Sequence, residues 1–222
     1  MKKLASSLAV AAWLCAGWAA PCAAAPITFS FTGSVTQTTF DPNDPFAGGI
    51  AFGTAFSGSY TFESTAADNI PFASNGSYNA FGLPYLFTVT IGGFTFSTSD
   101  ALNIGVGNGP ADQYSVLACA GGPFCFGSTW TLFLEDLDGA VFGSDALPVT
   151  APPLSAFETA LFTFRGFVDD NLVEISGQLE SLVCSVGCEP VGTPIPEAGT
   201  LALVATALGA LRLRRGRASS AG

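Results

Sequence analysis

The fold is decided by the stretch Phe87-Thr-Val-Thr-Ile-Gly-Gly-Phe-Thr-Phe96. Apolar residues alternate with threonine on both sides of Gly92-Gly93, and a period of two is the pattern of a half-buried strand. Two glycines between alternating runs predict a tight hairpin of type I′ or II′, because these turns need positive φ angles. We therefore expect two antiparallel strands, with Phe94 and Phe96 continuing the apolar face on the return strand.

The same period recurs on both sides of this hairpin. Further strands are expected at residues 27–35, 56–62, 114–118, 128–134, 159–168 and 171–182. Loops are expected at residues 41–49, 65–79 and 145–153, and one short helical turn near residues 152–157. One apolar and one polar face per strand suits antiparallel sheets. The predicted fold class is all-β, an antiparallel β-sandwich of two sheets, with a jelly roll or a barrel as the alternative.

Aromatic residues are expected to form the core. All 20 Phe lie in the body of the chain, residues 25–193, and burying one contributes roughly 1.5–3 kcal/mol. Trp130 alternates with Leu132 and Leu134 and is expected in the core. The alternative, a platform on which sugars stack, needs an exposed Trp130.

Charge excludes several classes of function. The net charge is −10, but the body holds one basic residue, Arg165, against sixteen acidic residues, which gives −15. Such a surface repels phosphate backbones and anionic lipid headgroups, so no nucleic-acid partner is expected. The absence of His excludes Ser-His-Asp and Cys-His catalysis. The body has no Lys to serve a phosphate-binding loop, so Gly105-Val-Gly-Asn-Gly109 is interpreted as turn glycine.

The N-terminus has the three parts of a secretory signal. Lys2 and Lys3 precede an apolar run, residues 4–20, and a small-residue cluster, residues 22–25, follows, with cleavage expected after Ala24. We expect residues 1–24 to direct the chain to the Sec translocon and to be removed by signal peptidase.

The C-terminus, residues 194–222, has a short apolar segment between a polar motif and a basic end. Pro194-Ile-Pro-Glu-Ala-Gly-Thr200 precedes the apolar residues 201–211. The basic end consists of Arg212, Arg214, Arg215 and Arg217, which stay cytoplasmic by the positive-inside rule. The apolar run is shorter than the roughly 20 residues of a permanent span. This order predicts a sorting signal with a short transmembrane helix; a simple tail anchor is the alternative.

This tail resembles the PEP-CTERM sorting signal of Gram-negative bacteria. Pro196 and Glu197 match the family's Pro-Glu-Pro motif, the arginines match its stop signal, and Ala198 replaces the second proline. The resemblance implies recognition and cleavage by an exosortase, a membrane cysteine peptidase-transpeptidase, after transient anchoring in the inner membrane. It also implies export to the cell surface or a biofilm matrix of exopolysaccharide. The body is similar to a recurrent type of PEP-CTERM substrate without assigned activity, in Phe31-Thr-Gly-Ser-Val35 and Phe56-Ser-Gly-Ser-Tyr-Thr-Phe62 among other segments.

Four cysteines remain in the body: Cys119, Cys125, Cys184 and Cys188. An even number in an exported chain predicts disulfides. Local pairing, Cys119 with Cys125 and Cys184 with Cys188, is preferred because each pair closes a short loop that contains Gly. A cross pairing and a Cys₄ zinc site are the alternatives.

Acidic turns are the candidate sites for metal. Glu135, Asp136 and Asp138 lie next to Gly139 after a strand, and their oxygens suit Ca²⁺. Residues 41–44 and 169–171 are similar turns, and a solvated turn is the alternative in all three. The leading hypothesis is a non-catalytic exported surface or matrix protein without a cofactor. A Ca²⁺-dependent carbohydrate-binding module and a secreted hydrolase are the other hypotheses.

Overall fold

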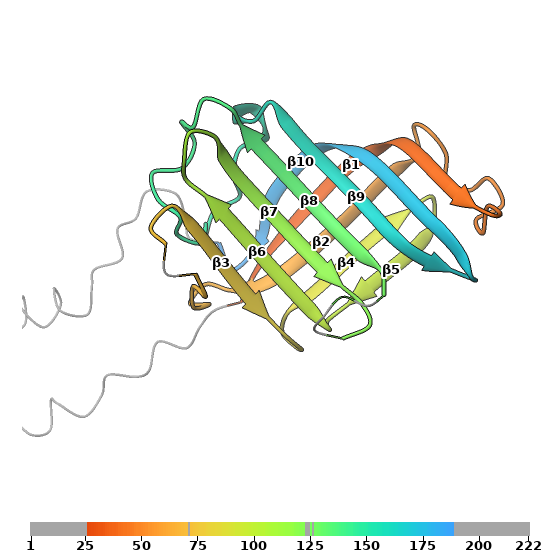
Figure 1. Ribbon diagram of the computed structural model, residues 1–222, viewed down its shortest axis with the longest axis horizontal. Coiled ribbons are helices and arrows are strands. Elements are labelled where there is room, and N and C mark those ends of the chain that lie inside the picture. The colour runs from red at the N-terminus through yellow and green to blue at the C-terminus, as the bar shows by residue number, and fades with distance from the viewer. Residues whose placement is uncertain (1–25, 71, 123–124, 126, 189–222) are drawn as a thin grey trace, which may run out of the picture. The chain divides into compact units, whose positions relative to one another are not determined.

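The computed structural model describes residues 26–70, 72–122, 125 and 127–188, and these form antiparallel strands and one 3₁₀ turn, without an α-helix. The strands are β1 (Pro26–Asp41), β2 (Ala55–Glu63), β3 (Asn75–Ala80), β4 (Leu86–Ile91), β5 (Phe94–Thr98), β6 (Ala101–Gly107), β7 (Asp112–Cys119), β8 (Thr129–Asp136), β9 (Thr159–Val168) and β10 (Asn171–Val186). They form one ten-stranded sheet in the order β3-β6-β7-β8-β9-β10-β1-β2-β4-β5, which Figure 1 shows curled so that β6 to β9 cross in front of β1, β2 and β4.

The curl follows from a short connection. Only Ser99 and Asp100 join β5, at one edge, to β6, which is second from the other edge. In a flat sheet these strands are about 38 Å apart at 4.8 Å per strand, whereas three Cα steps span about 11 Å. The sheet must therefore bend until its edges approach. Thr98 at the end of β5 accordingly donates from Oγ1 to the carbonyl of Cys119 on β7, at 2.6 Å.

The prediction of an all-β antiparallel fold is confirmed, with one correction. Two sheets were expected, but the described strands form one continuous sheet. Its two halves, β3-β6-β7-β8-β9 and β10-β1-β2-β4-β5, pack against each other as the layers of a sandwich do. Neighbouring strands are mostly consecutive in the chain, so the Greek-key crossings of a jelly roll are not found among them. The central hairpin is as expected: Gly92 (φ 56°) and Gly93 (φ 91°) both have the positive φ of a type I′ turn.

Most expected strands are present, but the sequence pattern missed β3 and β6. The expected loop at residues 65–79 contains most of β3. Gly105 and Gly107, interpreted as turn glycines, lie inside β6. The expected helical turn is present as η1 (Leu154–Ala156). Both missed strands contain Gly and Asn, which are depleted in strands, although Leu102, Ile104 and Val106 of β6 keep the period of two and are buried. Their pairing with each other and with β7 establishes them as strands.

Aromatic rings from the two halves interdigitate to form the core. Phe162 on β9 lies against Phe31 and Phe56, with ring centroids 6.3 and 4.8 Å away. Glycines make room for these rings, since a Cβ at Gly58 would meet the ring of Phe31 and a Cβ at Gly33 that of Phe56. The expectation that Phe packs in the core needs a correction for five residues on the surface: Phe52, Phe72, Phe81, Phe94 and Phe167.

A pair of tyrosines joins the two halves at the centre of the core. Tyr60 on β2 and Tyr114 on β7 are 0% exposed, and their hydroxyl oxygens lie 2.8 Å apart. Burial, and secondarily the Tyr114 hydroxyl, raises the pKa of Tyr60 well above its ordinary value, and burial raises the pKa of Tyr114 likewise. Both hydroxyls therefore stay protonated and neutral in the folded protein.

Candidate functional site

Three acidic residues lie in one row at one end of β7, β8 and β9. Asp112 pairs directly with Asp136 across β7 and β8. Glu135 pairs with Thr159, so Glu158, one residue earlier, continues the row opposite Asp136. Side chains alternate between the two faces of a strand. All three acidic residues are separated by an even number of positions from the buried aromatic and aliphatic residues of their strands, so they belong to the face that packs on the core. The row therefore lies at the end of the core.

A fourth carboxylate joins this row from the loop after β8. One carboxylate oxygen each from Asp136, Asp138 and Glu158 lies within 4.8 Å of the others. Asp136 is buried, whereas Asp138 and Glu158 are exposed. The backbone N–H of Asp138 donates to Asp136 Oδ1 at 3.1 Å, and that of Leu137 donates to Glu158 Oε2 at 3.0 Å. These side chains thus hold the loop that supplies Asp138. We call Asp112, Asp136, Asp138 and Glu158 the acidic cluster.

Asp112 is the most deeply buried member of the acidic cluster. It is 0% exposed, and its Oδ2 accepts the backbone N–H groups of Val141 and Phe142 at 2.8 and 2.6 Å. Its Oδ1 is buried and has no hydrogen-bond partner among the described residues. The preceding amide, that of Ala140, donates to Asp136 Oδ2 at 2.7 Å. Consecutive amides of one loop therefore bond to two neighbouring carboxylates.

No basic side chain in the described part of the chain balances these charges. Arg165 is its one basic residue, and it forms an exposed ion pair with Glu174, its cross-strand partner, at 3.0 Å. Like charges directly opposite each other on neighbouring strands destabilise a sheet. The acidic cluster therefore suits a positively charged ligand with affinity for oxygen.

The structure places one of the three sequence-predicted metal ligands elsewhere. Glu135 lies on the opposite face of β8 from Asp136 and accepts a hydrogen bond from Gln113 Nε2 at 2.9 Å. Glu158 takes its place beside Asp136 and Asp138. Strand alternation alone is enough to separate Glu135 from Asp136. The partnership with Glu158 depends on the register of β8 and β9, which no local sequence signal gives.

The other two acidic turns bind their own loops or face solvent. Asp44 accepts the amides of Phe46 and Gly48 at 2.8 and 2.7 Å. Asp169 and Asp170 form the exposed turn between β9 and β10, both with positive φ. Within the described ranges, neither turn joins a group of three metal-ligating side chains.

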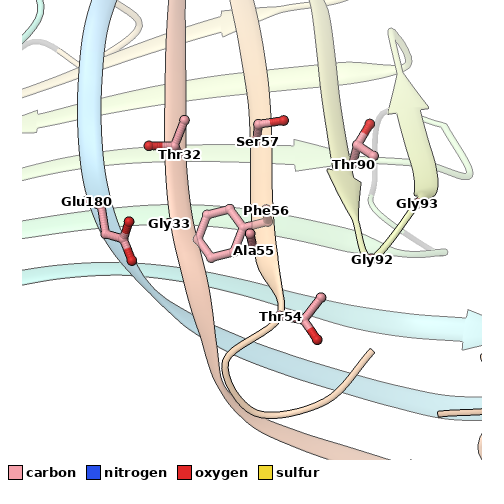
Figure 2. Close-up of a pocket in the computed structure, with 10 residues that line it drawn as sticks. All are labelled: Thr32, Gly33, Thr54, Ala55, Phe56, Ser57, Thr90, Gly92, Gly93 and Glu180. Atoms are coloured by element: carbon pink, nitrogen blue, oxygen red, sulfur yellow. The ribbon is translucent and has the colours of Figure 1, made fainter. Parts of the chain in front are cut away.

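A second candidate surface is the outer face of β5, β4, β2, β1 and β10. Its rows of hydroxyls follow the strand register, and one row consists of Thr95, Thr90, Ser57, Thr32 and Ser181. Thr90 Oγ1 lies 2.8 Å from Thr95 Oγ1, and Thr32 Oγ1 lies 2.6 Å from Ser181 Oγ. Figure 2 shows a shallow hollow on this row, lined by Thr32, Ser57 and Thr90, with Glu180 at one side. We call this surface the hydroxyl face.

Sequence reasoning identified the alternating Ser and Thr residues only as the polar side of the strands. The available signal was the repetition of the same alternation in every strand of this half of the sheet. Trp130 is 4% exposed and packs 5.3 Å from Phe164 between ring centroids, so its assignment to the core is confirmed. It provides no stacking surface for a sugar.

The cysteines form two local disulfides. Cys119 pairs with Cys125 and Cys184 with Cys188, with Cα atoms 5.0 and 6.0 Å apart. This is the pairing that the loop lengths favoured, and it leaves no thiol of these four for a zinc site. Disulfides persist in oxidising compartments, so the two bonds fit an extracytoplasmic location.

The signal and sorting segments lie outside the described residues. These include residues 1–24, the motif residues Pro196 and Glu197, and the arginines Arg212, Arg214, Arg215 and Arg217. Within the part of the chain that is described, no helix has the length and apolar character needed to cross a membrane.

Comparison with known proteins finds no matching family model, no matching curated protein and no matching solved structure.

Proposed function

We propose that this chain is a non-catalytic surface or extracellular-matrix protein that is exported, held briefly in the inner membrane and released by exosortase cleavage near Pro196 and Glu197. Its sandwich-like domain then associates with exopolysaccharide. The observation that carries the proposal is the pair of disulfides in the domain, because such bonds form outside the reducing cytosol. The signal-like N-terminus and the PEP-CTERM-like tail give the route.

The position of the second disulfide suits a domain that loses its tail. Strand β10 ends at Val186, and Cys188 is bonded back to Cys184 within that strand. Cleavage near Pro196 therefore removes no residue of a described strand or disulfide. We expect the domain to remain folded after release.

The C-terminal mass of the secreted protein tests this route. In cells with an exosortase, intact-mass analysis should show a chain that ends near residue 196, and deletion of the exosortase should leave the tail attached. Glu197→Ala should block release, and Ala198→Pro, which restores the family's motif, should increase it. A secreted protein that still ends at Gly222 contradicts the proposal.

A second candidate function is a carbohydrate-binding module, which the hydroxyl face favours. The hydroxyls stand on neighbouring strands, which are about 4.8 Å apart, and they donate and accept hydrogen bonds, as sugar hydroxyls do. Glu180 is the one charged residue that lines the hollow. We expect electrophoresis in gels that contain dextran, a neutral polysaccharide, to retard the domain. The triple variant Thr32→Ala, Ser57→Ala, Thr90→Ala should lose this retardation.

A matched control lies on the outer face of the other half of the sheet. Thr131 and Thr163 are cross-strand partners there, and changing both to Ala should leave the retardation unchanged. Equal retardation in gels with and without dextran rejects a carbohydrate-binding role. Repeating the experiment with a chelator tests whether binding depends on Ca²⁺.

A further inference from the structure

We propose that the acidic cluster binds one calcium ion, with Asp136, Asp138 and Glu158 as protein ligands and Asp112 as a buried carboxylate that the same ion neutralises. The proposed calcium site depends only on the folded domain, so its test is independent of the tests of sorting and of carbohydrate binding.

The spacing of the oxygens fits one ion. Calcium binds oxygen ligands at 2.3–2.6 Å, so two ligands of one ion are at most about 5 Å apart. The three ligand oxygens lie within 4.8 Å of one another, so one ion can touch all three after a small adjustment of the exposed side chains of Asp138 and Glu158. Asp138 and Glu158 are exposed, which leaves room for the water molecules that complete a shell of six to eight oxygens.

The second observation is the unpartnered oxygen of Asp112. A buried carboxylate without compensation is strongly disfavoured, yet Asp112 Oδ1 has no hydrogen-bond partner among the described residues. Cβ atoms of directly opposed cross-strand residues are about 4.5–5.5 Å apart, so Asp112 and Asp136 start from neighbouring positions on the same face of the sheet. A divalent cation held by Asp136 therefore also lowers the electrostatic cost of the charge on Asp112, and no basic side chain among the described residues is there to do so.

The chemistry of the ligands selects a hard cation. The acidic cluster offers only oxygen, whereas structural zinc sites use sulfur and imidazole nitrogen. Magnesium requires near-ideal octahedral geometry at 2.0–2.1 Å. Ligands that come from one rigid strand end, one loop and one strand start suit the irregular shell of calcium better.

A calcium ion bound to the acidic cluster would restrain the loop that covers the end of the core. Residues 137–142 follow β8, and their amides already bond to Glu158, Asp136 and Asp112. Phe142 on this loop packs 6.5 Å from Tyr114 and 6.0 Å from Phe157, between ring centroids. An ion that holds the acidic cluster together therefore also holds Phe142 over the core.

The test uses the exported protein, treated with a chelator and dialysed, with titration calorimetry and melting temperature as readouts. Extracellular calcium sites have dissociation constants of about 10⁻⁴–10⁻³ M. For a constant of about 10⁻⁴ M, about 10 mM Ca²⁺ should raise the melting temperature by roughly 5–10 °C. Calorimetry should give one ion per chain. Sodium chloride at the same ionic strength controls for general screening of the negative surface.

Four variants separate the site from the rest of the acidic surface. Asp138→Asn and Glu158→Gln are exposed, so they should fold and lose at least tenfold in affinity. The double variant Asp169→Asn, Asp170→Asn on the β9–β10 turn is the control and should bind as wild type does. Asp112→Asn should raise the melting temperature of the calcium-free protein and reduce the calcium-dependent increase, because a neutral side chain needs no cation.

Each contrary result overturns the assignment. Absence of heat and of a melting-temperature change in wild type excludes a calcium site. If sodium chloride raises the melting temperature as much as Ca²⁺ does, the effect is screening alone. If Mg²⁺ raises it equally, the site does not prefer calcium. Unchanged affinity in both Asp138→Asn and Glu158→Gln places the ion somewhere else.

Discussion

Replacing Tyr114 by Phe removes one hydroxyl from the core and leaves the hydroxyl of Tyr60 buried without its partner. The two oxygens are 2.8 Å apart and both residues are 0% exposed, so water does not replace the lost bond. A buried polar group without a partner costs about 1–3 kcal/mol. We expect the free energy of unfolding to fall by this amount, and Tyr60→Phe to give a similar loss from the other half of the sheet.

The double variant Tyr60→Phe, Tyr114→Phe should recover most of the loss. The native bond contributes a net of about 0.5–1.5 kcal/mol, and removing both hydroxyls leaves no buried donor or acceptor without a partner. We therefore expect the double variant within about 1 kcal/mol of wild type, and a coupling energy of at least about 1 kcal/mol between the two sites.

Urea unfolding, followed by the fluorescence of the buried Trp130 and by circular dichroism, measures these free energies. Tyr85→Phe is the control, because its hydroxyl donates to Glu63 Oε2 at 3.0 Å in a half-exposed position where water can replace the bond. It should cost less than either core variant. Losses that simply add in the double variant would refute the reasoning, because they would mean that the two hydroxyls do not stabilise each other.

Two further predictions concern the same core. Raised pKa values of Tyr60 and Tyr114 mean that the folded state keeps protons that the unfolded chain releases, so the contribution of these tyrosines to stability should be constant below about pH 10 and fall above it, by up to about 1.4 kcal/mol per pH unit for each tyrosine. Urea midpoints as a function of pH check this, and a wild-type slope no steeper than that of the double Phe variant contradicts it. Gly58→Ala should cost about 1–3 kcal/mol, because its Cβ meets the ring of Phe31 and a backbone carbonyl, whereas Gly143→Ala in open space should stay within about 0.5 kcal/mol. Equal urea midpoints for these two variants reject the packing argument.

The candidate metal site shows where local sequence reasoning ends. The density of carboxylates at residues 135–138 points to the turn where Asp136 and Asp138 join the acidic cluster. Glu135 was included because it is adjacent in the chain, but adjacency in a strand sends a side chain to the other face. Glu158 and Asp112 enter through the pairing of β8 with its two neighbours.

Strands β3 and β6 were missed for a related reason. Their sequences, Asn-Gly-Ser-Tyr-Asn-Ala and Ala-Leu-Asn-Ile-Gly-Val-Gly, contain residues that favour turns when they are judged alone. Tertiary contacts reverse that preference, because Tyr78 is buried and donates its hydroxyl to the carbonyl of Asp145 at 2.9 Å. The amide of Ser77 donates to Asp68 at 2.8 Å and helps to fix the edge strand.

By itself, the sequence determined the period of two, the β4–β5 hairpin and the buried faces of most strands, and it favoured local over crossed disulfides. All of these depend on residues close together in the chain. The tertiary structure decided that there is one curled sheet, that Tyr60 meets Tyr114, and that Asp112, Asp136 and Glu158 lie side by side. These features depend on which strands become neighbours, and that choice is made by the packing of the whole core and by the two-residue link between β5 and β6.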